Sequence, residues 1–305
     1  MITYESPDKI NWFLVSWTLS NKCNYRCSYC PDHLHNGSTG QPLWSTVERF
    51  IKNFKVDKEI CYRISGGEPT HYKHFMDMAK LVKTEGHVFS FMTNGSQSVD
   101  YYKEISKHSD GIIISYHPEY ADTKHIINVA NSVSCPVALN LMLIPNQFDS
   151  ILNIAETLFK NTDKLAIWPK VILDKSNPDN ISNKPAAYTD SQLDLLKNWP
   201  YFRKLDDSKL HRGNILLDNV KTDANQLILN GLNRHRNWMC YGGLDMINID
   251  MWGNMYRTDC KNGGPLGNIE RYGLPIIPIR CDMDSCNCLS DIYLRKERCE
   301  FGANV

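Results

Sequence analysis

The sequence predicts an α/β fold in which six strand–helix units form a partial barrel, followed by a small β-hairpin and helix extension. Between residues 12 and 172, short apolar runs alternate with segments whose apolar residues recur every three or four positions, as in parallel sheets with right-handed crossovers. After residue 239 the composition changes, and closely spaced cysteines replace this alternation. Six units are too few to close an eight-stranded barrel, so we expect an open one.

The individual elements follow from local patterns. Residues 12–20 form an apolar run rich in aromatic and β-branched side chains, which predicts the first strand. Residues 44–55 carry Val47, Phe50 and Phe54 on one helical face, which predicts the first covering helix. By the same criteria the later strands span residues 60–64, 87–92, 111–115, 136–144 and 164–172, and the later helices span residues 72–84, 98–108, 122–131, 149–160 and 189–198.

The stretch after the sixth strand carries weaker patterns. Residues 174–188 are rich in turn formers, which predicts a loop. Further on, residues 227–229 read Leu-Ile-Leu, which suggests a strand. We expect the barrel domain to span residues 1–215 and the extension to span residues 216–305.

The composition is that of a globular protein without a dominant charge. Of its 305 residues 42% are hydrophobic, and Lys plus Arg and Asp plus Glu number 34 each, so nucleic acid is disfavoured as the main partner. The amino terminus lacks the pattern of a secretory signal, and no apolar run is long enough to span a membrane. Eleven cysteines without an export signal indicate metal ligands rather than disulfides, so we expect a cytoplasmic protein.

Three cysteines follow the first predicted strand at a spacing suited to an iron–sulfur cluster. Cys23, Cys27 and Cys30 can supply three thiolates from one loop to a cubane cluster, which leaves one iron without a protein ligand. An open coordination position distinguishes metal sites that do chemistry from structural ones. A structural zinc or an electron-transfer cluster is the alternative, but both normally need a fourth ligand nearby, and the next cysteine is Cys61.

This spacing, with an aromatic residue before the third cysteine and a Gly-Gly-Glu-Pro turn at residues 66–69, resembles the signature of the radical S-adenosylmethionine (SAM) superfamily. The resemblance implies a partial, TIM-like barrel and a 4Fe-4S cluster whose open iron is chelated by SAM. It also implies that one electron, from a donor such as flavodoxin or ferredoxin, cleaves SAM to a 5'-deoxyadenosyl radical. That radical then abstracts a hydrogen from the substrate.

Candidate SAM ligands lie at the ends of successive strands. Gly66 and Gly67 allow the backbone to approach the methionyl ammonium because no side chain is in the way, and Glu68 and Pro69 would fix the turn. By resemblance, polar residues at later strand ends bind the ribose hydroxyls or the carboxylate: Thr93, Asn94, Ser115, His117 and Asn140. Each of these could instead be an ordinary turn or cap residue. The sixth strand ends in Trp168, Lys170 and Asp174, which are predicted to face the same rim.

A second group of cysteines marks the extension: Cys240, Cys260, Cys281, Cys286 and Cys288. Residues 240–260 alternate apolar and polar side chains around a Gly-Asn turn, which predicts a β-hairpin. The pattern resembles the SPASM extension, called twitch in its shorter form, although Cys260 lies further from the turn than that family usually places it. One auxiliary iron–sulfur cluster of the 4Fe-4S type fits the cysteine count, with Cys286 and Cys288 competing for one position. Zinc bound by the same four cysteines is the alternative.

Together these motifs favour a radical SAM enzyme, an oxidoreductase with a small-molecule substrate. A saturated auxiliary cluster would accept an electron, so the leading hypothesis is oxidation or rearrangement of a polar small molecule such as a sugar, cyclitol or nucleotide derivative. The 22 residues before Cys23 leave no room for a peptide-recognition domain, which favours this reading. A radical peptide- or protein-modifying maturase and a non-catalytic iron–sulfur or zinc binding module are the alternatives. The sequence identifies no catalytic base.

Overall fold

The computed structural model describes residues 1–4, 12–172, 187–203, 215–286 and 288–299. The strands of the main sheet are β2 (Trp12–Thr18), β3 (Glu59–Ser65), β4 (Val88–Thr93), β5 (Gly111–Tyr116), β6 (Val137–Leu143), β7 (Leu165–Val171), β11 (Met246–Ile249), β12 (Asn254–Tyr256), β13 (Pro265–Asn268) and β14 (Arg271–Tyr272). The helices are α1 (Trp44–Asn53), α2 (Phe75–Thr84), α3 (Val99–Ile105), α4 (Thr123–Ser132), α5 (Phe148–Asn161), α6 (Asp190–Lys197), α7 (Ala224–Leu229) and α8 (Leu289–Ile292).

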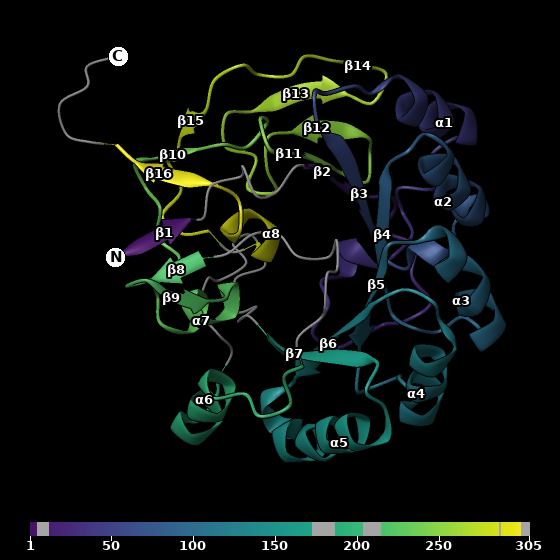
Figure 1. Cartoon of the computed structure of the whole chain (residues 1–305), viewed down its shortest axis with the longest axis vertical. Helices are drawn as coiled ribbons and strands as arrows, with labels where there is room; N and C mark the ends of the chain where they lie inside the picture. The colour runs from purple at the N-terminus through teal and green to yellow at the C-terminus, as the bar shows by residue number, and fades with distance from the viewer. Residues whose placement is uncertain (5–11, 173–186, 204–214, 287, 300–305) are drawn as a thin grey trace.

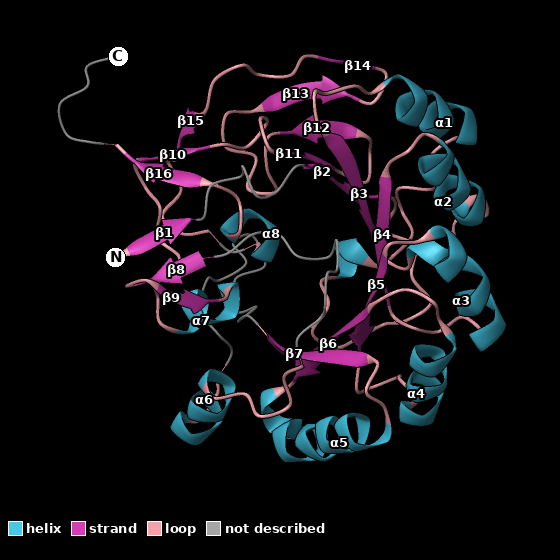
Figure 2. Ribbon diagram, in the orientation of Figure 1, coloured by secondary structure: helices cyan, strands magenta, loops and turns pink. Residues whose placement is uncertain are grey.

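The main sheet is a curved, largely parallel one (Figure 1). Strands β2 to β7 lie side by side in chain order, and each neighbouring pair is parallel. Helices α1 to α5 each follow one of these strands and cover the outside of the curve (Figure 2). The predicted α/β partial barrel is therefore confirmed.

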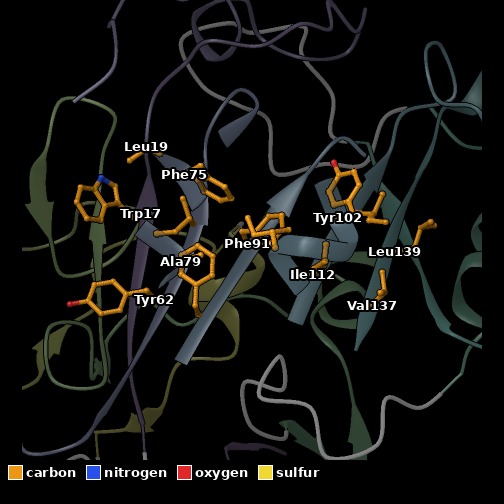
Figure 3. Packing of buried hydrophobic residues seen from close by; sticks show 14 of the residues in the cluster. Trp17, Leu19, Tyr62, Phe75, Ala79, Phe91, Tyr102, Ile112, Val137 and Leu139 are labelled. Carbon is orange, nitrogen blue, oxygen red and sulfur yellow. The ribbon is translucent and has the colours of Figure 1, made fainter. Parts of the chain in front are cut away.

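The two faces of this sheet differ in character. The helix-covered face holds the main core, where Trp17, Tyr62, Phe91 and Ile112 are almost fully buried (Figure 3). Successive strand residues point to opposite faces, so the neighbours of these core residues point away from the helices. This second face, called the inner face below, carries partly exposed side chains: Ser16, Ser65, Met92, Ser115, Asn140, Trp168 and Lys170.

The C-terminal segment continues the same sheet. Strand β11 pairs in parallel with β2 at the edge opposite β7, and β12, β13 and β14 extend the sheet in antiparallel fashion. The predicted hairpin at residues 240–260 is present as β11 and β12. Ile247, Ile249 and Met255 are fully buried in the main core. The division into residues 1–215 and 216–305 stays a prediction, and the sheet is continuous across it.

Two small sheets lie beside the open side of the curve. One joins β1 (Ile2–Tyr4), β8 (Ile215–Leu217) and β9 (Val220–Thr222), and the other joins β15 (Ile279–Arg280), β10 (Trp238–Cys240) and β16 (Lys296–Arg298). Strand β1 contacts β16, so the first described residues of the chain lie against its last strand (Figure 1). Among the described residues, none of the helices combines the length and the apolar composition needed to cross a bilayer.

The strand suggested at residues 227–229 is wrong, because these residues belong to helix α7. The Asp223 side chain caps this helix by accepting a hydrogen bond from the Gln226 N–H at 3.0 Å. The Leu227 and Ile228 side chains of this helix are buried. Three apolar residues in a row fit a buried helical turn as well as a strand, so the cap was the better signal. The predicted loop at residues 174–188, with Asp174, lies largely outside the described residues.

Candidate functional site

The loop that carries the cysteine triad lies against the turn after β3. The Gly67 N–H donates to the Ser20 carbonyl at 2.8 Å, and the Glu68 N–H donates to the Lys22 carbonyl at 2.7 Å. A Cβ at Gly66 would lie 2.6 Å from the Ser20 carbonyl oxygen, and one at Gly67 would lie 2.4 Å from the Lys22 carbonyl oxygen. Both positions therefore require glycine, because the two loops touch through their backbones. The backbone of the triad loop occupies the space that a side chain at either glycine would need.

The thiols of the triad lie within electrostatic reach of one another. The pKa of Cys27 is raised to about 12, mainly by burial, and negative charge on Cys30 and Cys23 contributes to the rise. Burial also raises the pKa of Cys23, so metal binding is what would ionise these thiols. In the described part of the chain, no three His, Cys, Asp or Glu side chains are drawn together closely enough to hold a metal. The fit of the triad to a cluster therefore rests on its shared loop and on this mutual influence.

Glu68 fastens the turn after β3 to the end of β4. It is buried, and its carboxylate accepts hydrogen bonds from the Thr70 hydroxyl at 2.7 Å, the Thr93 hydroxyl at 2.8 Å and the Asn94 N–H at 2.6 Å. Burial raises the pKa of Glu68, and these hydrogen bonds oppose the rise. The Asn94 amide in turn reaches the Cys23 sulfur at 3.8 Å. Thr93 and Asn94, predicted as SAM ligands, are thus placed directly beside the triad loop.

Residues after β5 hold the triad loop from another side. His117 Nδ1 lies 2.7 Å from the Tyr29 hydroxyl, and the two rings stack with an interplanar angle of 16°. The Glu119 carboxylate accepts hydrogen bonds from both the N–H, at 2.8 Å, and the hydroxyl of Ser28. The Tyr120 hydroxyl donates to a carbonyl of the same loop at 3.1 Å. His117 therefore contacts the loop, and its predicted contact with SAM stays a prediction. The sequence gives no signal that singles out Glu119 or Tyr120.

Further polar side chains line the inner face near the carboxyl ends of the strands. Ser115, Asn140 and Trp168 occupy one row of the sheet, because Asn140 pairs with both others across β5, β6 and β7. Lys170 follows two residues later on the same face. Its ammonium makes no hydrogen bond or ion pair with the described residues, and burial lowers its pKa while a charge on Cys288 would raise it. The structure thus places a desolvated ammonium beside the predicted row of polar residues.

The C-terminal cysteines, which lie far apart in the sequence, act on one another electrostatically. Burial is the main reason that the pKa values of Cys240, Cys260, Cys281 and Cys286 are all raised. Beyond burial, Cys240 is affected by Cys281, Cys260 by Cys240, and Cys281 by Cys260. Cys286 is affected by Cys288 and by Cys260. That these thiols share one metal stays a prediction, because no three of them lie close enough to hold one in the described part of the chain.

Cys286 and Cys288 have different surroundings within this set. Cys286 is buried, its N–H donates to the Asn233 carbonyl at 2.8 Å, and it is influenced by Lys296. Cys288 instead acts on Lys170 of the inner face, and a hydrogen bond with it lowers the pKa of Asp259. Cys286 thus shares the influence of Lys296 with Cys240 and Cys281, whereas Cys288 acts on Asp259 and Lys170.

The stacked ring of His117 should make stability depend on pH. Burial lowers the pKa of His117 to about 4, so folding disfavours its protonated form. The unfolded chain binds the proton from about pH 6.5 downward, so the stabilisation is complete above that pH and is lost as the pH falls toward 4. In metal-free protein we expect His117→Gln to lose about 2 kcal/mol less between pH 7 and pH 4.5 than the parent does.

Urea denaturation at the two pH values measures this difference. His235, whose pKa is also lowered by burial, to about 3, contributes equally to both proteins and cancels. Equal losses of stability in parent and variant would show that the His117 ring is solvated rather than packed on Tyr29.

Comparisons with known proteins extend this picture. A model of the radical SAM superfamily matches residues 17–128. An S-adenosylmethionine-dependent nucleotide dehydratase from a Thermoplasmatales archaeon (strain ISO4-H5) is 38% identical over 76 residues, which cover 25% of this chain and 26% of that protein. A GTP 3',8-cyclase from Haemophilus ducreyi is 36% identical over 83 residues, which cover 26% of this chain and 24% of that protein. The chain therefore matches only about a quarter of the length of these curated relatives.

Among solved structures, the fold is similar to the crystal structure of SuiB from Streptococcus suis. The TM-score is 0.57 at 15% sequence identity, and the match covers 85% of this chain and 64% of that one. At this identity the likeness shows the fold alone. Residues 17–128 are thus similar to the radical SAM superfamily, and they include both the cysteine triad and the glycine turn that touches its loop.

Proposed function

We propose that this protein is a radical SAM enzyme that binds a 4Fe-4S cluster through Cys23, Cys27 and Cys30 and acts on a polar small molecule, which it oxidises or rearranges. The observation that carries the proposal is the backbone contact between the triad loop and the Gly66–Gly67 turn, because it gathers the three thiols and the glycine turn at one end of the parallel sheet. Bound there, the cluster and SAM would together supply a 5'-deoxyadenosyl radical that removes a substrate hydrogen.

The residues around the triad would position these groups rather than react. Glu68 fixes the glycine turn relative to β4, so the backbone that faces SAM cannot shift independently of Asn94. His117 and Glu119 hold the triad loop from the side of β5. Ser115 and Asn140, on the inner face, offer the polar atoms that the ribose or carboxylate of SAM requires.

The inner face supports a polar, anionic substrate. Its row of Ser115, Asn140 and Trp168 combines hydrogen-bonding groups with an aromatic surface, a combination suited to a sugar, cyclitol or nucleotide derivative. Lys170 adds a positive charge that has no partner among the described residues. A desolvated ammonium favours a phosphate or carboxylate, because such a group restores the charge pairing that burial removed.

The second group of thiols would hold an auxiliary centre that accepts an electron. Cys240, Cys260, Cys281 and Cys286 are the proposed ligands, because each is raised in pKa by burial and influenced by another thiol of the group. Loss of a proton and one electron from a carbon radical next to a hydroxyl gives a carbonyl, and the auxiliary centre would take that electron. A flavodoxin or ferredoxin is the proposed donor for the first cluster.

Anaerobic reconstitution with iron and sulfide, followed by dithionite and SAM, tests the first step. The parent protein should form 5'-deoxyadenosine, and Cys27→Ala should reduce its formation by about 100-fold or more, because the loss of a ligand removes the cluster. Cys135→Ala is the control, because Cys135 packs against the main core and is not a proposed ligand. Formation at the same rate in Cys27→Ala, or none in the parent, would favour a non-catalytic module.

Binding of pyrophosphate to the metal-loaded protein tests the assignment of Lys170. Lys170→Met should weaken binding by about tenfold, because a hydrogen bond to a charged group contributes roughly 1.5 kcal/mol or more. Lys164→Met, at an exposed position before β7, should leave binding unchanged. Isothermal titration calorimetry measures both. Equal affinities for Lys170→Met and the parent would remove the argument for an anionic substrate.

The two neighbouring thiols before α8 provide a matched pair for the auxiliary centre. Cys286→Ala should lose the auxiliary metal, because Cys286 is buried and shares the influence of Lys296 with Cys240 and Cys281, whereas Cys288→Ala should retain it. Metal content per chain after reconstitution and desalting measures this difference. Loss of metal in Cys288→Ala and retention in Cys286→Ala would reverse the assignment.

A further inference from the structure

A buried asparagine lies between the two ends of the triad loop. Asn21 follows the last residue of β2 by three positions, precedes Cys23 by two, and is only 1% exposed. The carbonyls on either side of it, those of Ser20 and Lys22, accept the hydrogen bonds from the turn after β3. The Asn21 side chain instead contacts residues 33–39, which follow the last cysteine of the triad. Asn21 therefore joins the entrance of the triad loop to its exit.

This exit segment uses every polar group of the Asn21 side chain. Its Nδ2 donates to the His33 carbonyl at 2.9 Å, and it also lies 2.7 Å from Asn36 Oδ1 and 3.0 Å from the Ser38 hydroxyl oxygen. Its Oδ1 accepts hydrogen bonds from the Thr39 N–H at 3.1 Å and from the Thr39 hydroxyl at 2.7 Å. A buried amide that is satisfied in this way fixes the position of the groups around it.

The main chain closes the loop at the same place. The Gly37 N–H donates to the Asn21 carbonyl at 3.0 Å, and Lys22 and Asn36 form an isolated antiparallel bridge. Gly37 has a φ of 76°, and this left-handed conformation lets the chain turn back toward β2. All three cysteines of the triad lie between the two bridge residues. The three thiols thus belong to one loop that is closed at its base.

The hydrogen bonds that tie residues 33–39 to the rest of the described chain converge on Asn21. The other hydrogen bonds of this segment stay within residues 31–40. The next ties lie further along, where Gln41 Nε2 donates to the His71 carbonyl and the Tyr72 hydroxyl donates to a carbonyl two residues before α1. Loss of the Asn21 side chain would leave only backbone contacts at the base of the loop, and chain entropy favours the opening of such a loop.

We propose that Asn21 is the positioning residue that closes the triad loop, so that its three cysteines are gathered before any metal binds. The inference rests on the proposed function for its consequence, but the closure itself belongs to the metal-free chain. A closed loop restricts its cysteines in advance, which lowers the conformational entropy lost when three thiolates bind one group. Asparagine suits this task because its side chain donates and accepts at once, whereas an aspartate of the same shape has no N–H.

Hydrogen exchange of the metal-free, full-length protein tests the closure. Asn21→Ala should speed the exchange of residues 33–39 by about tenfold, because the side-chain hydrogen bonds no longer oppose opening. Asn21→Asp should have a similar effect, because a carboxylate has no proton to donate to the His33 carbonyl. Peptides from α5 should exchange as in the parent, which shows that both variants are folded.

Asn233→Ala is the matched control. Asn233 is also buried, at 4% exposed, and its amide donates to the Cys286 carbonyl at 2.8 Å in the C-terminal segment. This substitution removes a buried amide away from the triad loop, so the exchange of residues 33–39 should stay unchanged. Equal exchange in the parent and Asn21→Ala would overturn the inference, and so would an equally large effect of Asn233→Ala.

The reactivity of Cys27 separates positioning of the triad from simple support of the exit segment. Cys27 is buried, so in metal-free Asn21→Ala its alkylation by iodoacetamide should be about tenfold faster than in the parent, because an open loop exposes the thiol. Cys61, fully buried on β3, is the internal standard and should react equally slowly in both proteins. Faster exchange of residues 33–39 with unchanged alkylation of Cys27 would show that Asn21 does not position the triad, which overturns the inference.

A third measurement needs no substitution. The Gly37 and Thr39 N–H groups both donate to Asn21, so one opening event frees both, and exchange followed by nuclear magnetic resonance should show equal protection. Protection that differs by more than about tenfold would overturn the inference even if the Asn21 variants do not fold. These measurements use neither metal nor SAM, so a parent protein that forms no 5'-deoxyadenosine would overturn the proposed function and leave the closure standing.

Discussion

The contact between the glycine turn after β3 and the triad loop constrains the rest of the site. Both Gly66 and Gly67 approach carbonyl groups of the loop more closely than a side chain allows, and two backbone hydrogen bonds fix that approach. Glu68 then extends the constraint to the end of β4, and His117 and Glu119 extend it to the end of β5. A long loop whose regular structure is one short 3-10 helix, Asp32–Leu34, is thereby held by three successive strand ends, which is the rigidity that a reactive centre needs.

The sheet separates stability from chemistry by its two faces. The helix-covered face is filled with aromatic and branched side chains, and it supplies the apolar burial that holds the strands in register. The inner face carries the polar row of Ser115, Asn140 and Trp168 and the ammonium of Lys170. Because alternate residues of one strand serve the two faces, each strand can pack against the helices and still present polar groups on its other face.

The parallel barrel and the triad could be predicted because the residue patterns that indicate them lie within short stretches of the sequence. Helical and strand periodicities predicted the order of β2 to β7, and the cysteine spacing with the glycine turn predicted two loops that the structure brings into contact. What the sequence did not reveal are features that depend on distant partners. A short apolar run at residues 227–229 is ambiguous alone, and only the cap at Asp223 marks it as a helix. A lysine such as Lys296 is ordinarily exposed, and nothing near it in the sequence indicates that β1 and β10 will cover it.

The pairing of β11 with β2 could not be predicted either, because parallel strands so far apart in the chain leave no local pattern in the sequence. Yet this pairing places the C-terminal hairpin on the strand that leads directly into the triad loop. A shortened chain that ended before β11 would leave the backbone of β2 exposed along its whole edge, and such an edge invites pairing with other molecules. The segment between Cys240 and Cys260 therefore also protects the edge of the strand from which the triad loop emerges.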